Sequence, residues 1–283
     1  CCLHVKRSRN FIHTKVLKTT KAKCFKYLVR ICPVSCGNFQ NFSKYICDGD
    51  PNQAATVAQQ LGRKLFDMRD DLRIDTPDIE RALDIAETEP KGPIVLADVS
   101  DNAGGGAPSD ATFLLAAMIA RGMTSVATGL FYDPGAVRIC REAGEGATLP
   151  LRIGGKHGHM SGDPLDLVVT VKKHASGLTQ RFGKLPAPMG EAVWVECNGI
   201  DIVLNDMRGQ TFHPEAFEQL GIDLSQRRYI CVKSSNHYQA GFRPIAARII
   251  PVATPGSISP DYANIPYTKR GRDYWPAVED PFA

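Results

Sequence analysis

Apolar residues recur every three or four positions in several parts of the chain, which predicts amphipathic helices. The clearest stretch is 52–68, where Val57, Leu61 and Leu65 lie on one face. Four further stretches have the same period: 76–89, 109–121, 133–144 and a shorter one over 213–221. We therefore predict five helices between residues 52 and 221.

The residues that open these helices are of the types that cap helix N-termini. Thr76 is expected to cap the second helix, with Pro77 at its first position, and Ser109 or Asp110 is expected to cap the third. Asp133 stands before Pro134 at the start of the fourth. Each cap would satisfy a backbone N–H group that lacks a partner within the helix.

Continuous or alternating apolar runs between the helices predict β-strands. They cover 93–97, 124–130, 148–153, 165–172, 193–197, 200–204 and 229–233, and 245–252 supplies a last helix or strand. Strands and helices alternate up to residue 144, which favours parallel crossovers. After residue 147 strands dominate, and Asn198-Gly199 is a strong hairpin signal. We predict an α/β fold with an open mixed sheet, parallel in its first half and built of antiparallel hairpin strands in its second.

Charge separates the first fifty residues from the rest. Residues 1–50 carry ten Lys or Arg and two acids, whereas residues 51–283 carry a net charge of −4. Three interpretations fit the basic segment: a targeting peptide, a basic arm for nucleic acid, or sequence that is not native. The lack of an initiating Met and the abrupt change of composition favour the last. We expect residues 1–50 to lie outside the fold, as a disordered or non-native segment, and residues 51–283 to form the α/β domain.

Cysteines follow the same division. Six lie in the first fifty residues, without a paired C-x-x-C, so a zinc site there is disfavoured. Cys140, Cys197 and Cys231 stand in apolar runs, as small buried hydrophobic residues do. This usage predicts a reduced, cytoplasmic protein. No apolar run approaches the roughly 20 residues of a membrane-spanning helix, so no membrane association is expected.

The loop over 98–110 joins a predicted buried strand to a predicted helix. Asp98, Asp101 and Asn102 are followed by three consecutive glycines, Gly104–Gly106. Backbone N–H groups in such a loop can surround an anion at a helix N-terminus. The alternative is a tight turn that only needs positive φ angles, with both acids capping it.

A second polar run, Lys233-Ser234-Ser235-Asn236-His237, also follows a predicted strand. A Ser–His nucleophile is disfavoured, because the run lacks a G-x-S-x-G turn and an assignable orienting acid. Anion binding or hydrogen bonding to a substrate fits these side chains better. Elsewhere, His157, His159 and Asp163 could bind a metal, but a solvated glycine-rich loop is the default interpretation.

In order along the chain, 98–110, 154–156, 233–238 and 254–256 resemble the C-terminal domain of the microcystinase C family. The resemblance runs from about residue 52 to the end of the chain. It implies a zinc-dependent peptidase or amide hydrolase in which this half walls the substrate cleft. The substrate-contacting residues expected on this basis are Asp98, Asp101, Asn102, Gly104, Gly105, Gly106, Lys233, Ser234, Ser235 and His237.

In that family the metal ligands belong to an N-terminal α/β domain that residues 1–50 do not resemble. No metal ligand carries over to this sequence, and zinc is expected only with that further domain. We therefore expect a truncated, catalytically silent cleft half, whose partners are the metal-binding domain and a peptide or small amide substrate. The alternative is a non-enzymatic binding module whose basic arm binds nucleic acid or an organelle import system. It ranks lower, because the arm lacks interleaved aromatics and the body is acidic, so nucleic acid is not an expected partner.

Overall fold

The computed structural model describes residues 6–8, 11–13, 24–26, 45–47 and 50–281, and the chain divides into two compact units, Cys1–Asp75 and Thr76–Ala283. The first unit contains two short antiparallel pairs, β1 (Lys6–Ser8) with β2 (Phe11–His13) and β3 (Cys24–Lys26) with β4 (Tyr45–Cys47). Its helix α1 spans Pro51–Asp67, as the apolar period predicts, and the Asp50 carboxylate accepts a hydrogen bond from Gln53 N at 2.9 Å.

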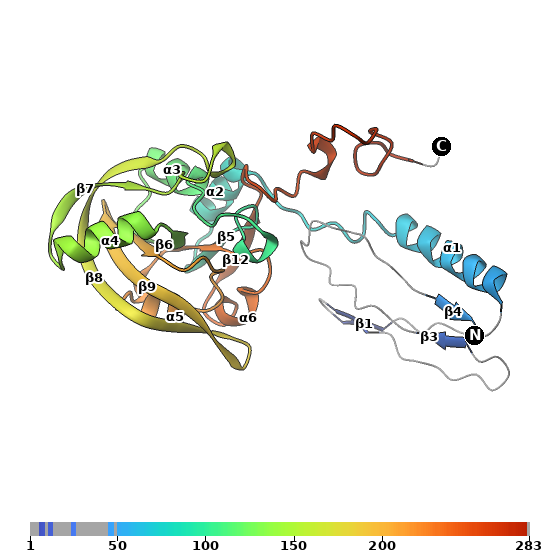
Figure 1. Ribbon diagram of the computed structural model, residues 1–283, viewed down its shortest axis with the longest axis horizontal. Coiled ribbons are helices and arrows are strands. Elements are labelled where there is room, and N and C mark those ends of the chain that lie inside the picture. The colour runs from blue at the N-terminus through green and yellow to red at the C-terminus, as the bar shows by residue number, and fades with distance from the viewer. Residues whose placement is uncertain (1–5, 9–10, 14–23, 27–44, 48–49, 282–283) are drawn as a thin grey trace. The chain divides into compact units, whose positions relative to one another are not determined.

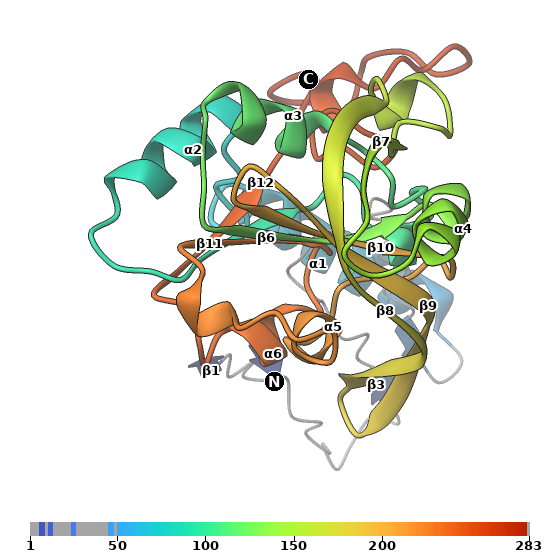
Figure 2. The same ribbon diagram turned by 90° about the vertical axis from the view of Figure 1, so that its left-hand side faces the viewer.

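The second unit is built on an eight-stranded mixed sheet in the order β12-β5-β11-β6-β10-β9-β8-β7 (Figures 1 and 2). The strands are β5 (Ile94–Asp98), β6 (Val126–Tyr132), β7 (Thr148–Ile153), β8 (Leu165–Phe182), β9 (Leu185–Cys197), β10 (Ile200–Asn205), β11 (Tyr229–Lys233) and β12 (Arg248–Val252). Strands β12, β5, β11, β6 and β10 run parallel, whereas β10, β9, β8 and β7 pair antiparallel. The predicted mixed α/β sheet is confirmed.

Helices cover both faces of this sheet (Figure 2). Helices α2 (Ile79–Thr88), α3 (Phe113–Ala120) and α4 (Pro134–Ala143) pack in one apolar cluster, and the short α5 (Glu215–Glu218) and α6 (Gln239–Phe242) pack in another. Strand β5 contributes side chains to both clusters, because successive side chains of a strand point to opposite faces of the sheet. Leu96 lies in the first cluster and Val95 and Ala97 in the second. A strand buried on both sides explains its continuous apolar sequence.

Two hairpins shape the antiparallel half. Asn198 and Gly199 have φ angles of 50° and 79° and join β9 to β10, which confirms the predicted turn. Strands β8 and β9 extend well beyond the predicted runs and form a long arm that turns between Phe182 and Leu185 (Figure 1). The arm was missed because its side chains are mostly exposed and lack an alternating apolar face.

Two predicted helix caps are wrong. Asp78, and not Thr76, caps α2, since its carboxylate accepts from Arg81 N at 2.9 Å. Pro77 is part of the connection, where its carbonyl accepts from Ala253 N. Helix α3 begins only at Phe113, after a Thr112 whose side chain makes no cap. The two predicted caps of α3, four and three residues upstream, hold loops together instead, as described below. The cap of α4 by Asp133 is confirmed, with Ala136 N at 3.1 Å.

Candidate functional site

The two polar runs singled out in the sequence meet at the carboxyl edge of the parallel strands. Strand β5 lies between β11 and β12, and in this register Asp98 is paired with Lys233 on one side and Val252 on the other. The loops that follow these strands therefore start side by side. This edge is where ligands bind in open α/β sheets.

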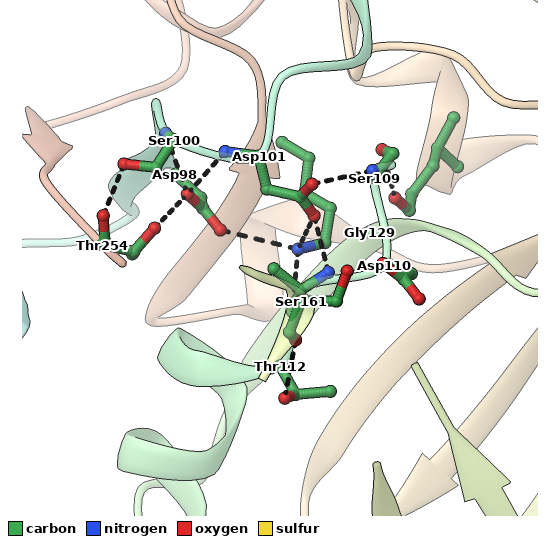
Figure 3. Close-up of polar contacts among 12 residues, drawn as sticks. Asp98, Ser100, Asp101, Ser109, Asp110, Thr112, Gly129, Ser161 and Thr254 are labelled. Carbon is green, nitrogen blue, oxygen red and sulfur yellow. Dashed lines mark hydrogen bonds and ion pairs between the residues drawn. The ribbon is translucent and has the colours of Figure 1, made fainter. Parts of the chain in front are cut away.

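A buried ion cluster forms the floor of this edge (Figure 3). The Lys233 ammonium lies 2.9 Å from Asp101 Oδ2 and 3.5 Å from Asp98 Oδ2, and it donates to the carbonyl of Ala111 at 2.6 Å. The three charged side chains are between 2% and 5% exposed. Burial lowers the pKa of Lys233, but the carboxylates of Asp101 and Asp98 outweigh it, so the lysine pKa is raised and the ammonium stays charged.

Only one carboxylate oxygen of Asp98 accepts hydrogen bonds from the described residues. Its Oδ1 accepts from the backbone N–H groups of Ser100 and Asp101, both at 3.2 Å, and from Thr254 Oγ1 at 2.7 Å (Figure 3). Its Oδ2 receives no hydrogen bond from the described residues. Burial raises the pKa of the Asp98 carboxyl, with Lys233 opposing the rise and Asp101 adding to it. The raised pKa means that the Asp98 carboxyl takes up a proton more readily than an exposed aspartate does.

Asp101 folds the loop back on itself. Its Oδ1 accepts from Ser109 N and its Oδ2 from Ala111 N, each at 2.7 Å. These bonds hold Ser109 at a positive φ of 69°. They also occupy its backbone N–H group, four residues before helix α3 begins. Asp101 therefore fixes the loop that the sequence predicted, with its own oxygens already occupied.

The space next to Lys233 is too small for a substrate. In a cavity between β5, β11 and α3, the centre of a water molecule can occupy a volume of about 10 Å³, which is room for a single water. It is lined by Asp98, Thr128, Phe131 and Lys233 among others. The ion cluster is therefore a structural floor, and any substrate would have to lie on the exposed residues above it.

The glycines of the loop lie on the surface, yet their N–H groups are not left for an anion. Gly104 N donates to Asn102 Oδ1 at 3.0 Å, Gly105 N to Asn102 O at 2.9 Å and Gly106 N to Ala103 O at 3.0 Å. The predicted anion cradle is therefore wrong, because the loop closes on itself as a short 3-10 turn, Ala103–Gly105. Gly106, at a φ of 101°, is where the turn needs glycine.

Gln210 ties the two runs into one rim, and sequence reasoning missed it. Its Oε1 accepts from Ser234 Oγ at 3.0 Å and lies 3.3 Å from His237 Nδ1, and a Cβ on Gly104 would overlap its amide nitrogen. We call the residues Asn102, Gly104, Gln210, Ser234, Ser235 and His237 the rim. Asn102 and Ser235 join it through a bond of 2.6 Å from Asn102 Nδ2 to Ser235 Oγ. His237 is exposed, so the rim presents an imidazole to solvent.

Two elements position Gln210, although no pattern in the sequence marks it. The next residue, Thr211, donates its hydroxyl to Gly129 O at 2.7 Å and accepts from Leu130 N at 2.8 Å, in the middle of β6. Gln180 on the long arm donates its amide to Gln210 O at 2.7 Å. Gln210 is thus placed by strands that lie about 30 and 80 residues away in the chain.

The comparisons with known proteins follow the same region. A model of the family described as "MlrC C-terminus" matches residues 96–269, more than half of the chain. The chain belongs to the MlrC C-terminus family. It is 35% identical over 231 residues to Microcystinase C of Sphingomonas sp, across 81% of this chain and 45% of that protein. The match includes both runs that form the rim, which confirms the predicted resemblance.

A solved structure agrees with this family and with the fold. The protein described as "Putative metallopeptidase" from Mesorhizobium sp. BNC1 superposes with a TM-score of 0.70 at 28% identity, over 82% of this chain and 47% of that one. This MlrC C-terminus chain therefore spans about half the length of both relatives. The relatives place it in a peptidase-like family.

A metal does not fit the described part of this MlrC C-terminus chain. Residues 50–281 contain no group of three His, Cys, Asp or Glu side chains placed to hold an ion. The two acids beneath the rim, Asp98 and Asp101, form ion pairs with Lys233. His157, a candidate ligand, instead has its Nδ1 2.8 Å from Asp110 Oδ2, and His159 and Asp163 do not complete a site with it.

Asp110 and Asp133 instead anchor the Gly154-Gly155-Lys156 turn. Asp110 Oδ2 accepts from Lys156 N at 2.7 Å, while Asp133 accepts from Gly154 N at 3.0 Å and from Lys156 Nζ at 2.6 Å. Burial alone would raise the pKa of Asp110, but the nearby Ser161 hydroxyl, His157 and the Lys156 N–H together lower it. Both aspartates are 1% exposed or less. The family motif at 154–156 is therefore held by two buried carboxylates.

Several predictions fall outside the described residues. The targeting, nucleic-acid and non-native interpretations of residues 1–50 rest largely on residues whose structure is not described, and so does the cysteine zinc site. Among the described residues, no helix has the length and apolar character needed to cross a bilayer. Cys140, Cys197 and Cys231 are free and buried, as predicted.

Proposed function

We propose that this chain supplies the substrate-contacting half of a metallopeptidase or amide hydrolase, with peptides or small amides as substrates. The exposed members of the rim, Gly104 and His237, contact the substrate together with Gly105 and Gly106. The buried members of the rim hold them in place, and Asp98, Asp101 and Lys233 support the rim from beneath. The metal, zinc in this proposal, is held by residues other than those described here, in a further domain of the kind that accounts for the relatives' greater length. The chain by itself is then catalytically silent.

The observation that carries the proposal is the way Gln210 joins Ser234, His237 and the glycine loop. Hydroxyl, amide and imidazole groups of this kind donate to and accept from a peptide backbone. They stand on a rigid base, because the Lys233 cluster satisfies the loop internally. A rim that is already ordered loses little entropy when a ligand binds, which supports a binding role.

The chemistry of the described residues supports contact with substrate and not bond cleavage. The two buried acids at the floor are paired with Lys233 and border a space with room for only a single water, so a substrate does not reach them. Ser234 and Ser235 are buried and hydrogen-bonded to side-chain amides. His237 is oriented by an amide and has no carboxylate partner among the described residues, unlike the base of a catalytic triad.

The test measures binding and cleavage separately on the full 283-residue chain. Short N-acetylated, C-amidated peptides are titrated without metal by ligand-observed NMR, and released amine is followed with and without zinc. We expect binding in the millimolar range without release of amine. His237→Ala and Gln210→Ala should each weaken binding several-fold, since each removes hydrogen-bonding groups from the rim.

A matched control is His174→Ala, because His174 lies on β8 outside the rim. It should leave peptide binding unchanged. Zinc-dependent hydrolysis by the chain alone, lost on His157→Ala or His159→Ala, would contradict the proposal that the chain is inactive by itself. It would also show that these two histidines bind a metal. Peptides that fail to bind at all would contradict the contact role of the rim.

A further inference from the structure

Three aromatic rings meet beside the rim, from three distant parts of the chain. Phe182 ends β8, Phe212 lies two residues after Gln210, and His237 belongs to the rim itself. The ring centroids of Phe182 lie 4.7 Å from Phe212 and 5.0 Å from His237, and those of Phe212 and His237 are 6.0 Å apart. The contacts are tilted or edge-to-face, which are favoured arrangements for aromatic pairs. We call these three residues the aromatic corner.

The aromatic corner is held in place from below. Gln180, which is 2% exposed and lies two residues before Phe182 on the same side of the strand, accepts from Phe212 N at 2.7 Å and donates to Gln210 O. One buried amide therefore fixes the arm of β8 and β9 against the segment 210–212. The rings do not depend on their own packing to stay together.

The corner is open to solvent in a way that the fold does not require. Phe182 is 42% exposed, Phe212 is half-buried and His237 is exposed. None of the three belongs to either apolar cluster of the core. Burial of an apolar ring is favourable, so an exposed ring at this place leaves apolar area for a ligand to cover.

The charge around the corner selects against a charged ligand group. Arg181, the cation next to Phe182 in the chain, is paired with Glu215 through Nε and Oε1 at 2.6 Å. The same carboxylate also lies 3.6 Å from His213 Nδ1. The corner thus offers aromatic faces and edges beside a neutralised Arg181, with the exposed Lys184 two residues after Phe182 in the turn. Aromatic surface of this kind suits an uncharged apolar side chain.

We propose that Phe182, Phe212 and His237 form a subsite for an aromatic or large aliphatic side chain of the peptide substrate. The proposal rests on the proposed function, because it places the peptide backbone along the rim. His237 belongs to both groups, so a backbone that lies along the exposed part of the rim, at Gly104 and His237, brings its side chain to the two phenylalanines. The arm of β8 and β9 then acts as a specificity element.

The experiment compares two peptides on the full chain without metal. N-acetyl-Gly-Phe-Gly-amide and N-acetyl-Gly-Ala-Gly-amide are titrated by ligand-observed NMR against the unmodified chain, Phe182→Ala and Leu185→Ala. Leu185 is the matched control, since it is paired with Phe182 across the arm and is 67% exposed, yet has no aromatic ring. Both substitutions remove an exposed apolar side chain from the same turn.

We expect the phenylalanine peptide to bind about tenfold more tightly than the alanine peptide, in line with one aromatic contact and its buried area. Phe182→Ala should remove that preference, whereas Leu185→Ala should keep it. Equal affinity of the two peptides for the unmodified chain, or equal losses in both variants, overturns the subsite. In that case binding weakened by Gln210→Ala leaves the proposed function standing, whereas the absence of any binding overturns both.

Discussion

The Lys233 ammonium and the Asp101 carboxylate lie 2.9 Å apart, although 132 residues separate them in the chain. Both side chains are almost fully buried. The contact joins the end of β11 to the loop after β5, so one ion pair links the two polar runs that the family shares. The same carboxylate also holds the backbone of Ser109 and Ala111. The rim is built on this pair.

Replacing Lys233 by methionine should strongly destabilise the fold. The change leaves Asp98 and Asp101 buried without their cation, and breaking a buried ion pair in this way costs about 3–5 kcal/mol. The free energy of unfolding from urea titrations of the full chain measures the loss. The matched control is Lys173→Met on the exposed side of β8, which should change it by less than about 0.5 kcal/mol. Similar values for the two variants would contradict the structural role of Lys233.

Asp110→Asn should lower stability at neutral pH by about 1.5–3 kcal/mol, the usual contribution of hydrogen bonds to a charged group. The pKa of Asp110 is lowered in the folded chain, so the unfolded chain binds the proton more tightly. The stabilisation is therefore present above the ordinary value of 3.8 and is lost as the pH falls through the folded pKa. Unfolding free energies of both proteins along a pH series should converge in acid.

Asp98→Asn should give the opposite pH dependence. Burial raises the pKa of Asp98, so the folded chain binds its proton more tightly than the unfolded chain does. That contribution is complete below 3.8 and is lost as the pH rises through the folded pKa. The stability of the unmodified chain relative to the variant should therefore fall with rising pH. A difference that grows with pH, as expected for Asp110→Asn, would show that Lys233 dominates over burial at Asp98.

Gly104→Ala should disturb the rim without affecting the core. A Cβ there would overlap the amide of Gln210, which is 8% exposed and bonded to Ser234. Displacing this amide should cost about 1 kcal/mol and weaken peptide binding. Gly135→Ala in α4 is the control, because a Cβ there meets nothing closer than 3.8 Å and alanine favours the helix by up to about 1 kcal/mol. Thermal unfolding separates the two, and equal shifts would contradict the close approach.

Asp133→Ala should cost more stability than the loss of a helix cap. Asp133 caps α4 and also binds Gly154 N and the Lys156 ammonium from a position that is 1% exposed. We expect a loss of about 2–3 kcal/mol. Asp78→Ala removes a cap on α2 that is exposed and makes no tertiary hydrogen bond to the described residues, so about 1 kcal/mol is expected. Urea titrations that give equal losses would mean that Asp133 acts as a cap only.

Local patterns predicted most elements because the forces that set them act over a few residues. The predicted strand over 148–153 matches β7 residue for residue, and Asn198-Gly199 forms the expected turn. Elements whose side chains face solvent were predicted least well. The outer halves of β8 and β9 lack an apolar face, so nothing in their sequence distinguishes them from a loop.

The sequence singled out most residues of the rim and of its floor, but not the contacts among them. Asp101 and Lys233 were expected to contact substrate, but in the structure they pair with each other beneath the rim. The N–H groups of the glycine loop were expected to bind an anion and are used within the turn. Gln210 and Phe182 were missed because neither belongs to a motif or to a periodic pattern.

The sequence alone determined the order of the elements, the mixed sheet, the family and the two polar runs, because these depend on local periodicity and on residue identity. Only the tertiary structure decided which polar groups satisfy one another and which remain exposed. That choice depends on contacts such as Lys233 with Asp101 and Gln180 with Gln210, which form only when the strands come into register. Hydrogen bonds and ion pairs act over a few ångströms in space, whatever the separation along the chain.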